Sequence, residues 1–128
     1  MKALNVLIVD DSAVMRRLVR RVVELTDVAI GEVHEAGNGR EALEVMARHS
    51  IDALFTDLNM PVMSGTELLR AINDRPELPP VRVVISTDGS DARRREAEAL
   101  DVTRYLEKPL RPEVMRDVLC ELADAFHN

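Results

Sequence analysis

The sequence predicts an α/β fold of three layers, with a parallel sheet between two layers of helices. Two observations predict it: short apolar runs alternate with stretches of helical period along the whole chain, and three of the runs are apolar almost throughout. Strands of a parallel sheet are covered on both faces, so they lack a polar and apolar alternation. With 128 residues, 46% of them apolar, we expect a single domain over 1–128 with no output domain.

Five strands are expected, and their composition indicates their order in the sheet. The nearly continuous apolar runs lie at 4–9, 53–56 and 81–86. The remaining strands, at 32–36 and 103–107, carry more polar residues, which is typical of sheet edges. This favours the spatial order 2-1-3-4-5, which is the flavodoxin-like doubly wound (βα)5 arrangement.

Five helices are expected between and after the strands, because apolar residues recur at helical spacing in most of these stretches and residues 91–100 have high helix propensity. Their ranges are 12–25, 39–48, 66–73, 91–100 and 112–127. The first helix is expected to bury Val14, Met15, Leu18, Val19 and Val22, and to expose Arg16, Arg17, Arg20 and Arg21. The last is expected to bury Val114, Met115, Val118, Leu119, Leu122 and Phe126. The helix at 91–100 offers mainly alanines to the core, so little free energy opposes its displacement.

Composition excludes several classes of protein. A formal net charge of −6 argues against non-specific nucleic-acid binding. No apolar run approaches the ~20 residues that span a bilayer, and the charged N-terminal residues leave no room for a secretory signal, so we expect a cytoplasmic protein. One cysteine, Cys120, allows no internal disulfide and is expected to pack in the last helix. The histidines His34, His49 and His127 show no metal-ligand spacing.

Polar residues collect where the predicted strands end. Asp10 and Asp11 follow the first strand, Asp57 the third, Ser86 ends the fourth, and Lys108 follows the fifth. In this fold the carboxyl ends of the strands form the ligand site, at the switch point between the first and third. Lys108 is notable because only two of the 17 basic residues are lysines. A compact ammonium and a guanidinium are not interchangeable.

Each of these residues alone has an ordinary structural explanation, such as a helix cap, a turn residue or a solvated charge. Together they predict a metal site, because three neighbouring carboxylates repel unless a cation neutralises them. Oxygen ligands suit Mg²⁺, and the charges of three carboxylates, Mg²⁺ and Lys108 sum to zero. Such a site can accept a phosphoryl group, with Asp57 as the nucleophile at the end of the central strand.

The combined motifs resemble those of response-regulator receiver domains, and the stand-alone chemotaxis (CheY-like) type is the nearest. The motifs are Val9-Asp10-Asp11-Ser12, Asp57-Leu58-Asn59-Met60-Pro61 with Gly65, Ser86-Thr87 and Lys108-Pro109. The resemblance implies that Asp57 accepts phosphate from a sensor histidine kinase. It implies Mg²⁺ ligation by Asp11, Asp57 and the Asn59 carbonyl, with Asp10 acting through a metal-bound water.

The resemblance also implies which residues would change position when the phosphoryl group binds. Lys108 would pair with the phosphoryl oxygens, Ser86 would be the switch hydroxyl on a loop, and Tyr105 would turn inward with it. It further implies a cis Lys108–Pro109 peptide. The resemblance further implies that Asn59, Thr87 and Asp88 occupy tuning positions, which set the lifetime of the phosphoryl group. We expect ordinary self-dephosphorylation, with Asp88 orienting the attacking water.

The resemblance implies that a downstream protein would bind the surface formed by the helix at 91–100, the strand at 103–107 and the helix at 112–127. A monomer or weak dimer is expected. The triplet Arg93, Arg94 and Arg95 is either a solvated face or a patch for an acidic partner.

Other functions remain as alternatives. The protein could shuttle phosphate to a histidine phosphotransfer protein. A Mg²⁺-dependent aspartyl-phosphate phosphatase would need an acid two residues after its nucleophile, where this chain has Asn59. A flavin binder is disfavoured because Asp10 and Asp11 would repel its phosphate. A receiver that binds partners without phosphorylation would not need the full set of acids, Ser86 and Lys108.

Overall fold

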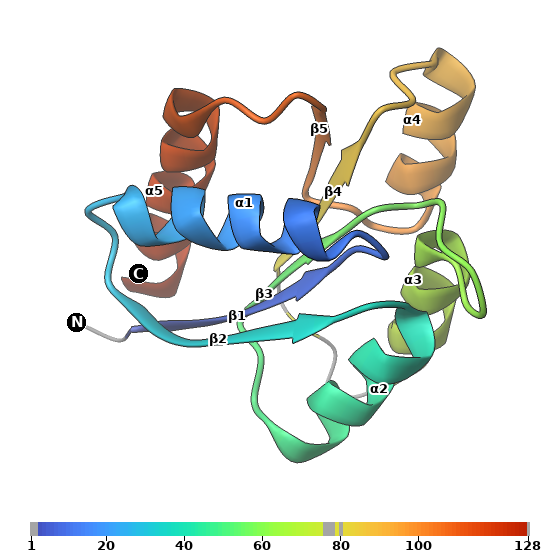
Figure 1. Cartoon of the computed structure of the whole chain (residues 1–128), viewed down its shortest axis with the longest axis horizontal. Coiled ribbons are helices and arrows are strands. Elements are labelled where there is room, and N and C mark those ends of the chain that lie inside the picture. The colour runs from blue at the N-terminus through green and yellow to red at the C-terminus, as the bar shows by residue number, and fades with distance from the viewer. Residues whose placement is uncertain (1–2, 76–78, 80, 128) are drawn as a thin grey trace.

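The computed structural model describes residues 3–75, 79 and 81–127. In this part of the chain one parallel sheet has the order β2-β1-β3-β4-β5, as predicted (Figure 1). Its strands are β1 (Leu4–Val9), β2 (Ile30–Ala36), β3 (Ala53–Thr56), β4 (Val81–Ser86) and β5 (Arg104–Glu107). The helices are α1 (Ala13–Leu25), α2 (Gly39–Arg48), α3 (Gly65–Asn73), α4 (Asp91–Ala99) and α5 (Pro112–His127).

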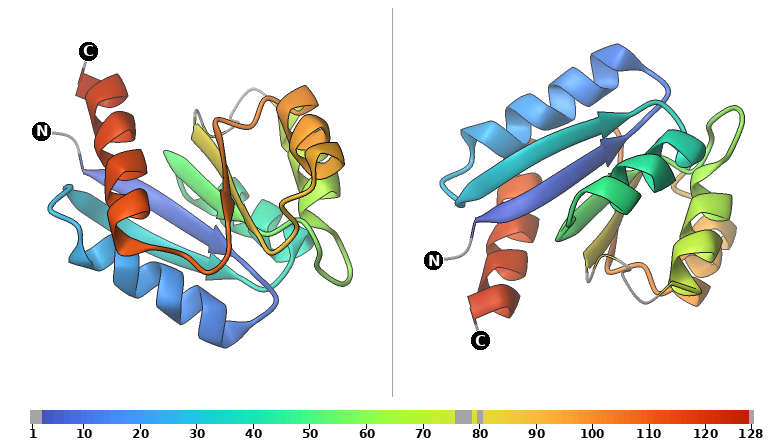
Figure 2. Two further views of the ribbon diagram at one scale, coloured as in Figure 1. Left: turned by 90° about the horizontal axis from the view of Figure 1, so that it is seen from above. Right: turned by 90° about the horizontal axis from the view of Figure 1, so that it is seen from below.

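Helices cover both faces of the sheet, which explains the apolar central strands. α1 and α5 lie on one face and α2, α3 and α4 on the other (Figure 2). Successive β1 residues alternate between the two layers: Ile8 packs in the core beneath α1 and α5, and Leu7 and Val9 pack in the core beneath the other helices. β2 and β5, at the edges, are only partly buried.

Short polar residues set the helix starts. Ser12, Asn38, Ser64 and Ser90 each accept a hydrogen bond from the backbone N–H three residues later, at the starts of α1 to α4. Most predicted boundaries agree within one residue. β2 is the exception, because pairing of Leu4 with Ile30 starts that strand two residues before the predicted position 32.

The predicted buried face of α1 was partly wrong. Val14 and Leu18 are 71% and 44% exposed, whereas Val19 and Val22 are buried as predicted, together with Val23. Arg16 and Arg20 were expected to point into solvent, but both form ion pairs with Glu35 of β2. The helix therefore contacts the sheet through a narrower apolar stripe, and its arginines bind the edge strand.

The other helices largely match their predicted faces. α5 buries Met115, Val118, Leu119 and Leu122, whereas Val114 is 36% exposed and the Phe126 side chain lies outside the described residues. Cys120 is partly buried in this helix, as expected. α4 buries Ala97 alone among its residues. None of the helices in the described ranges is long and apolar enough to cross a membrane.

Candidate functional site

The backbone ladder extends past the strands and places three charged residues at one edge of the sheet. The N–H of Asp10 donates to Ala36 (3.1 Å), that of Asp57 to Val9 (3.0 Å), and that of Lys108 to Ser86 (2.9 Å). Each residue directly follows its strand, so the three side chains start from neighbouring positions. The predicted convergence at the carboxyl ends is therefore what the structure shows.

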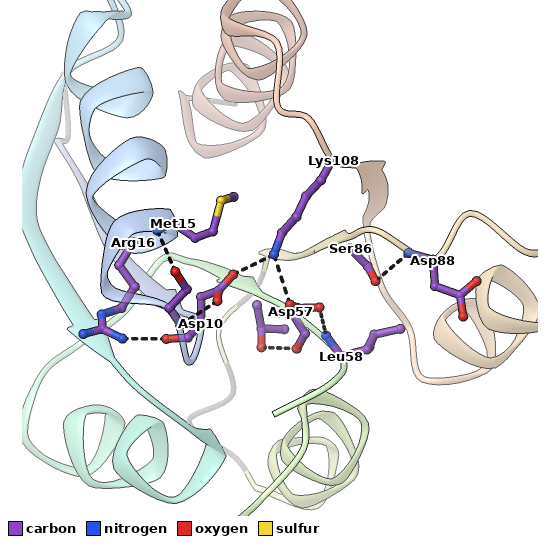
Figure 3. A network of polar contacts seen from close by, with 10 residues as sticks. Asp10, Met15, Arg16, Asp57, Leu58, Ser86, Asp88 and Lys108 are labelled. Carbon is purple, nitrogen blue, oxygen red and sulfur yellow. Dashed lines mark hydrogen bonds and ion pairs between the residues drawn. The ribbon is translucent and has the colours of Figure 1, made fainter. Parts of the chain in front are cut away.

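Lys108 lies between two of the predicted carboxylates (Figure 3). Its Nζ is 2.9 Å from Asp10 Oδ2 and 3.1 Å from Asp57 Oδ2, and all three side chains are at most 12% exposed. Burial lowers the pKa of Lys108, but the hydrogen bonds and charges of the two aspartates outweigh this effect and raise the pKa above its usual value. The ammonium is therefore held charged at neutral pH.

The three aspartates form one oxygen-rich cluster. Asp10 is buried, Asp57 is partly buried and Asp11 is exposed, and one carboxylate oxygen of each lies within 4.8 Å of those of the others. Lys108 compensates one of these charges, which leaves a formal charge of −2. A hard divalent cation matches both this residual charge and the all-oxygen donor set, so the residues present fit Mg²⁺.

The carboxylate of Asp57 is fixed in orientation. Its Oδ1 accepts a hydrogen bond from the backbone N–H of Leu58 at 2.7 Å, and its Oδ2 binds Lys108. The loop from Leu58 returns to the strand at Gly65, whose N–H donates to the Leu58 carbonyl at 2.9 Å. This hydrogen bond holds the start of α3 against the backbone that directly follows β3, next to Asp57.

Ser86 and Tyr105, the predicted switch residues, both bind the backbone of Asp88. Ser86 is the last residue of β4 and fully buried, whereas the sequence had placed its hydroxyl on a loop. Its Oγ accepts from the Asp88 N–H at 3.2 Å, and the Tyr105 hydroxyl donates to the Asp88 carbonyl. The Arg94 guanidinium lies 4.8 Å from the centre of the Tyr105 ring. A movement of either switch residue therefore acts on the backbone of Asp88, Ser86 on its N–H and Tyr105 on its carbonyl.

Arg93 joins two of the predicted tuning positions, Asn59 and Asp88, through contacts that the sequence patterns did not predict. Its guanidinium donates to Asn59 Oδ1 at 3.2 Å and lies 3.5 Å from Asp88 Oδ2. The backbone N–H of Ser90 donates to the same Asp88 carboxylate, and this bond, with Arg93, lowers the pKa of Asp88. Thr87, the remaining tuning position, is exposed.

Arg16 is a further contact that the sequence did not predict. Its guanidinium donates to the Asp10 carbonyl at 2.7 Å and to Glu35 at 3.2 Å. Helical periodicity had assigned it to the solvent face of α1. Because Arg16 lies one turn after the helix start, its long side chain can reach back to the end of β1.

A groove of about 340 Å³ lies beside the site, between α4, β5 and the start of α5. Residues 105–111 line it, together with Arg94 and Val114. Lys108 and Tyr105 both belong to this lining, so the groove and the charged cluster share Lys108. The Lys108–Pro109 peptide in the same segment is cis, as the resemblance implied.

Comparison with known proteins decides the family. A family model described as "Response regulator receiver domain" matches residues 6–119. The chain belongs to this family. It is 36% identical to chemotaxis protein CheY1 of Helicobacter pylori, with 91% of this chain and 94% of that protein covered. It is also 40% identical to protein-glutamate methylesterase/protein-glutamine glutaminase 3 of Hahella chejuensis, of which it spans 34%.

Solved receiver structures have the same fold. Chemotaxis protein CheY4 of Vibrio cholerae superposes with a TM-score of 0.84 at 30% identity, covering 94% of this chain and 99% of that one. The receiver domain of AraT from Geobacillus stearothermophilus gives 0.85 at 32% identity, covering 98% and 97%. The protein is therefore a CheY-like receiver domain of a two-component response regulator.

Proposed function

We propose that this receiver accepts a phosphoryl group on Asp57 from the phosphohistidine of a sensor kinase. The observation that carries the proposal is the placement of Asp57, with one carboxylate oxygen on the Leu58 N–H and the other on the Lys108 ammonium. An Asp57 oxygen would attack the phosphorus as the phosphorus–nitrogen bond breaks, and the imidazole would leave and take up a proton. Lys108 would shift from carboxylates to phosphoryl oxygens.

Asp10, Asp11 and Asp57, with the Asn59 carbonyl, would hold the Mg²⁺. When bound, the ion would offset negative charge on the transferring phosphoryl group. Asp57 and Lys108 would position that group at the end of β3, where the buried Asp10 and Lys108 already lie close together. The roles overlap only at Asp57, which would be both a cation ligand and the nucleophile. Asp11 would bind the cation directly, Asp10 would act through a metal-bound water, and Lys108 would compensate charge.

The conformational change caused by phosphorylation would pass from the site to α4 through the backbone of residue 88. Phosphorylation adds charge and strong acceptor oxygens, which the Ser86 hydroxyl can bind if it leaves the Asp88 N–H. Tyr105 binds the carbonyl of the same residue, Asp88. This residue precedes α4, which buries little apolar surface. A change there would move α4 and reshape the groove against β5 and α5, where we place the binding of a downstream protein.

Phosphorylation by acetyl phosphate tests the proposal directly. Purified protein with Mg²⁺ is expected to incorporate one phosphoryl group, which intact-protein mass spectrometry measures. A single group is expected because, of the three clustered aspartates, Asp57 is the one that binds both the Lys108 ammonium and the Leu58 N–H. Asp57→Asn or removal of Mg²⁺ with EDTA should abolish incorporation. Asp74→Asn, an exposed acid at the end of α3, is the matched control and should label normally. Labelling that survives in Asp57→Asn would refute the assignment.

Arg93→Ala should accelerate loss of the phosphoryl group. In the present structure Arg93 and Ser90 occupy the Asp88 carboxylate, which the sequence assigned to orienting a water. Removing the guanidinium frees Asn59 Oδ1 and Asp88 Oδ2, while the Ser90 N–H keeps Asp88 Oδ1 in place. The expected gain is several-fold, well below the ~10²–10⁴-fold effect of a fully positioned acid–base group.

The decay of phosphorylated protein after removal of the donor measures this effect. Arg95→Ala, on the same helix but exposed, is the control and should leave the decay rate unchanged. Decay that is equal in Arg93→Ala and wild type would show that the Arg93 contacts do not limit water access.

A further inference from the structure

Two histidines that are far apart in sequence lie together at the edge of the sheet. The histidines show no metal-ligand spacing along the sequence, but the fold brings the rings of His34 and His49 into contact. Their rings stack with centroids 4.1 Å apart and planes inclined by 30°. Glu32 completes the group, because one donor atom of each of the three residues lies within 4.8 Å of the others.

The fold explains why these residues meet. Glu32 and His34 are two positions apart on β2, so their side chains leave the edge strand on the same side. His49 directly follows α2, whose chain returns past this edge before β3. Asn5 fixes the spacing: its Oδ1 accepts from the Glu32 N–H at 2.9 Å, and its Nδ2 donates to the Ser50 carbonyl at 3.2 Å.

The geometry points to a binding site for one divalent transition-metal ion, of the Zn²⁺ type, held by Glu32, His34 and His49. Two imidazoles and a carboxylate are the donor set that such ions prefer, whereas Mg²⁺ prefers the all-oxygen cluster around Asp57. The fourth position of a tetrahedral ion would be filled by water. The site is separate from the proposed phosphoacceptor and does not depend on it.

Little movement is needed to close the site. Tetrahedral Zn²⁺ with bonds of ~2.0–2.1 Å places its ligand atoms about 3.3 Å apart. The His34 Nε2 to Glu32 Oε2 distance is already 3.5 Å. The rest of the closure requires only side-chain rotation of His49 and Glu32, which are exposed and free to change rotamer.

Calorimetric titration of tag-free protein with ZnCl₂, in excess Mg²⁺ to occupy the aspartate cluster, tests the site. We expect one Zn²⁺ per chain. His34→Gln and His49→Gln should each weaken binding by at least about tenfold, since loss of an outer-sphere partner alone costs ~10–100-fold. Imidazole ¹⁵N resonances of His34 and His49 should shift on binding, and Zn²⁺ should raise the Tm of wild type but not of His49→Gln.

Two further variants distinguish this site from other donors. His127→Gln removes the third histidine of the sequence, and Cys120→Ser removes the only thiol. Both should bind Zn²⁺ as wild type does. The inference is overturned if wild type shows no saturable uptake, if uptake is unchanged in His34→Gln or His49→Gln, or if either control variant loses it.

Discussion

Gly65→Ala is expected to destabilise the protein by about 3 kcal/mol or more and to lower the Tm by about 10 °C. A Cβ at Gly65 would lie 1.8 Å from the Asp57 carbonyl oxygen and 2.8 Å from Leu58 Cα. Both atoms are backbone at the end of β3, so no side-chain rotation can relieve the overlap. The first turn of α3 and the strand end would have to separate.

This separation would also affect the site. The Gly65 N–H donates to Leu58, and Ser64 and Glu67 form a reciprocal capping box at the same turn. Moving α3 away therefore weakens the backbone that orients the Asp57 carboxylate. We expect slower phosphorylation by acetyl phosphate in the variant even at a temperature where it remains folded.

Urea unfolding measures the stability effect, and two other glycines provide controls. At Gly37 an added Cβ meets Glu41 carboxylate oxygens at 3.4 and 3.6 Å, so Gly37→Ala should change stability by less than about 0.5 kcal/mol. At Gly39 the nearest atoms belong to the flexible Met63 side chain, at 2.6 and 2.9 Å, so Gly39→Ala should have an intermediate effect. Equal urea midpoints for Gly65→Ala and Gly37→Ala would contradict the close approach.

The order of the strands could be predicted from sequence because burial on both faces leaves a direct mark on composition. The same reasoning located the site, since residues that end neighbouring parallel strands must converge. The Lys108 ammonium accordingly donates hydrogen bonds to both Asp10 and Asp57. These predictions depend on local pattern and topology alone.

Contacts between segments that are distant in sequence could not be predicted in this way. Helical period gives the direction of a buried face but not its width, so Val14 and Leu18 were wrongly assigned to the core. Arg93 meets Asn59 and Asp88 only because α4 lies beside the β3–α3 loop. Spacing along the chain carries no record of such packing.

Lys108→Met is expected to cost about 3–5 kcal/mol of stability in EDTA, the usual cost of removing one partner from a buried ion pair. The substitution keeps a side chain of similar length but leaves the Asp10 and Asp57 carboxylates, 7% and 12% exposed, without their cation. Lys108→Arg should cost less, because it keeps the charge while changing the shape of the donor. Arg70→Met, on the exposed side of α3, is the control for loss of a surface cation.

The pH dependence follows from the raised pKa of Lys108. A raised folded-state pKa means that the stabilisation is fully present below the ordinary lysine pKa of 10.5 and is lost as the pH rises through the folded-state value. The difference between wild type and Lys108→Met should therefore be constant through neutral pH and shrink only under strongly alkaline conditions. Urea midpoints collected from neutral to alkaline pH measure it.

Mg²⁺ should partly rescue the same variant. The Lys108 ammonium and a bound cation neutralise the same carboxylates, so removing the ammonium raises the negative charge available to the ion and should tighten Mg²⁺ binding. Mg²⁺ should then increase the urea midpoint of Lys108→Met more than that of wild type, by linkage. Phosphorylation by acetyl phosphate should nevertheless fall, because no ammonium remains to meet the phosphoryl oxygens. Tighter Mg²⁺ binding together with lost phosphorylation would separate the structural role of Lys108 from its chemical one. Weaker Mg²⁺ binding in the variant would contradict the idea that the Lys108 ammonium and Mg²⁺ compete for the same carboxylates.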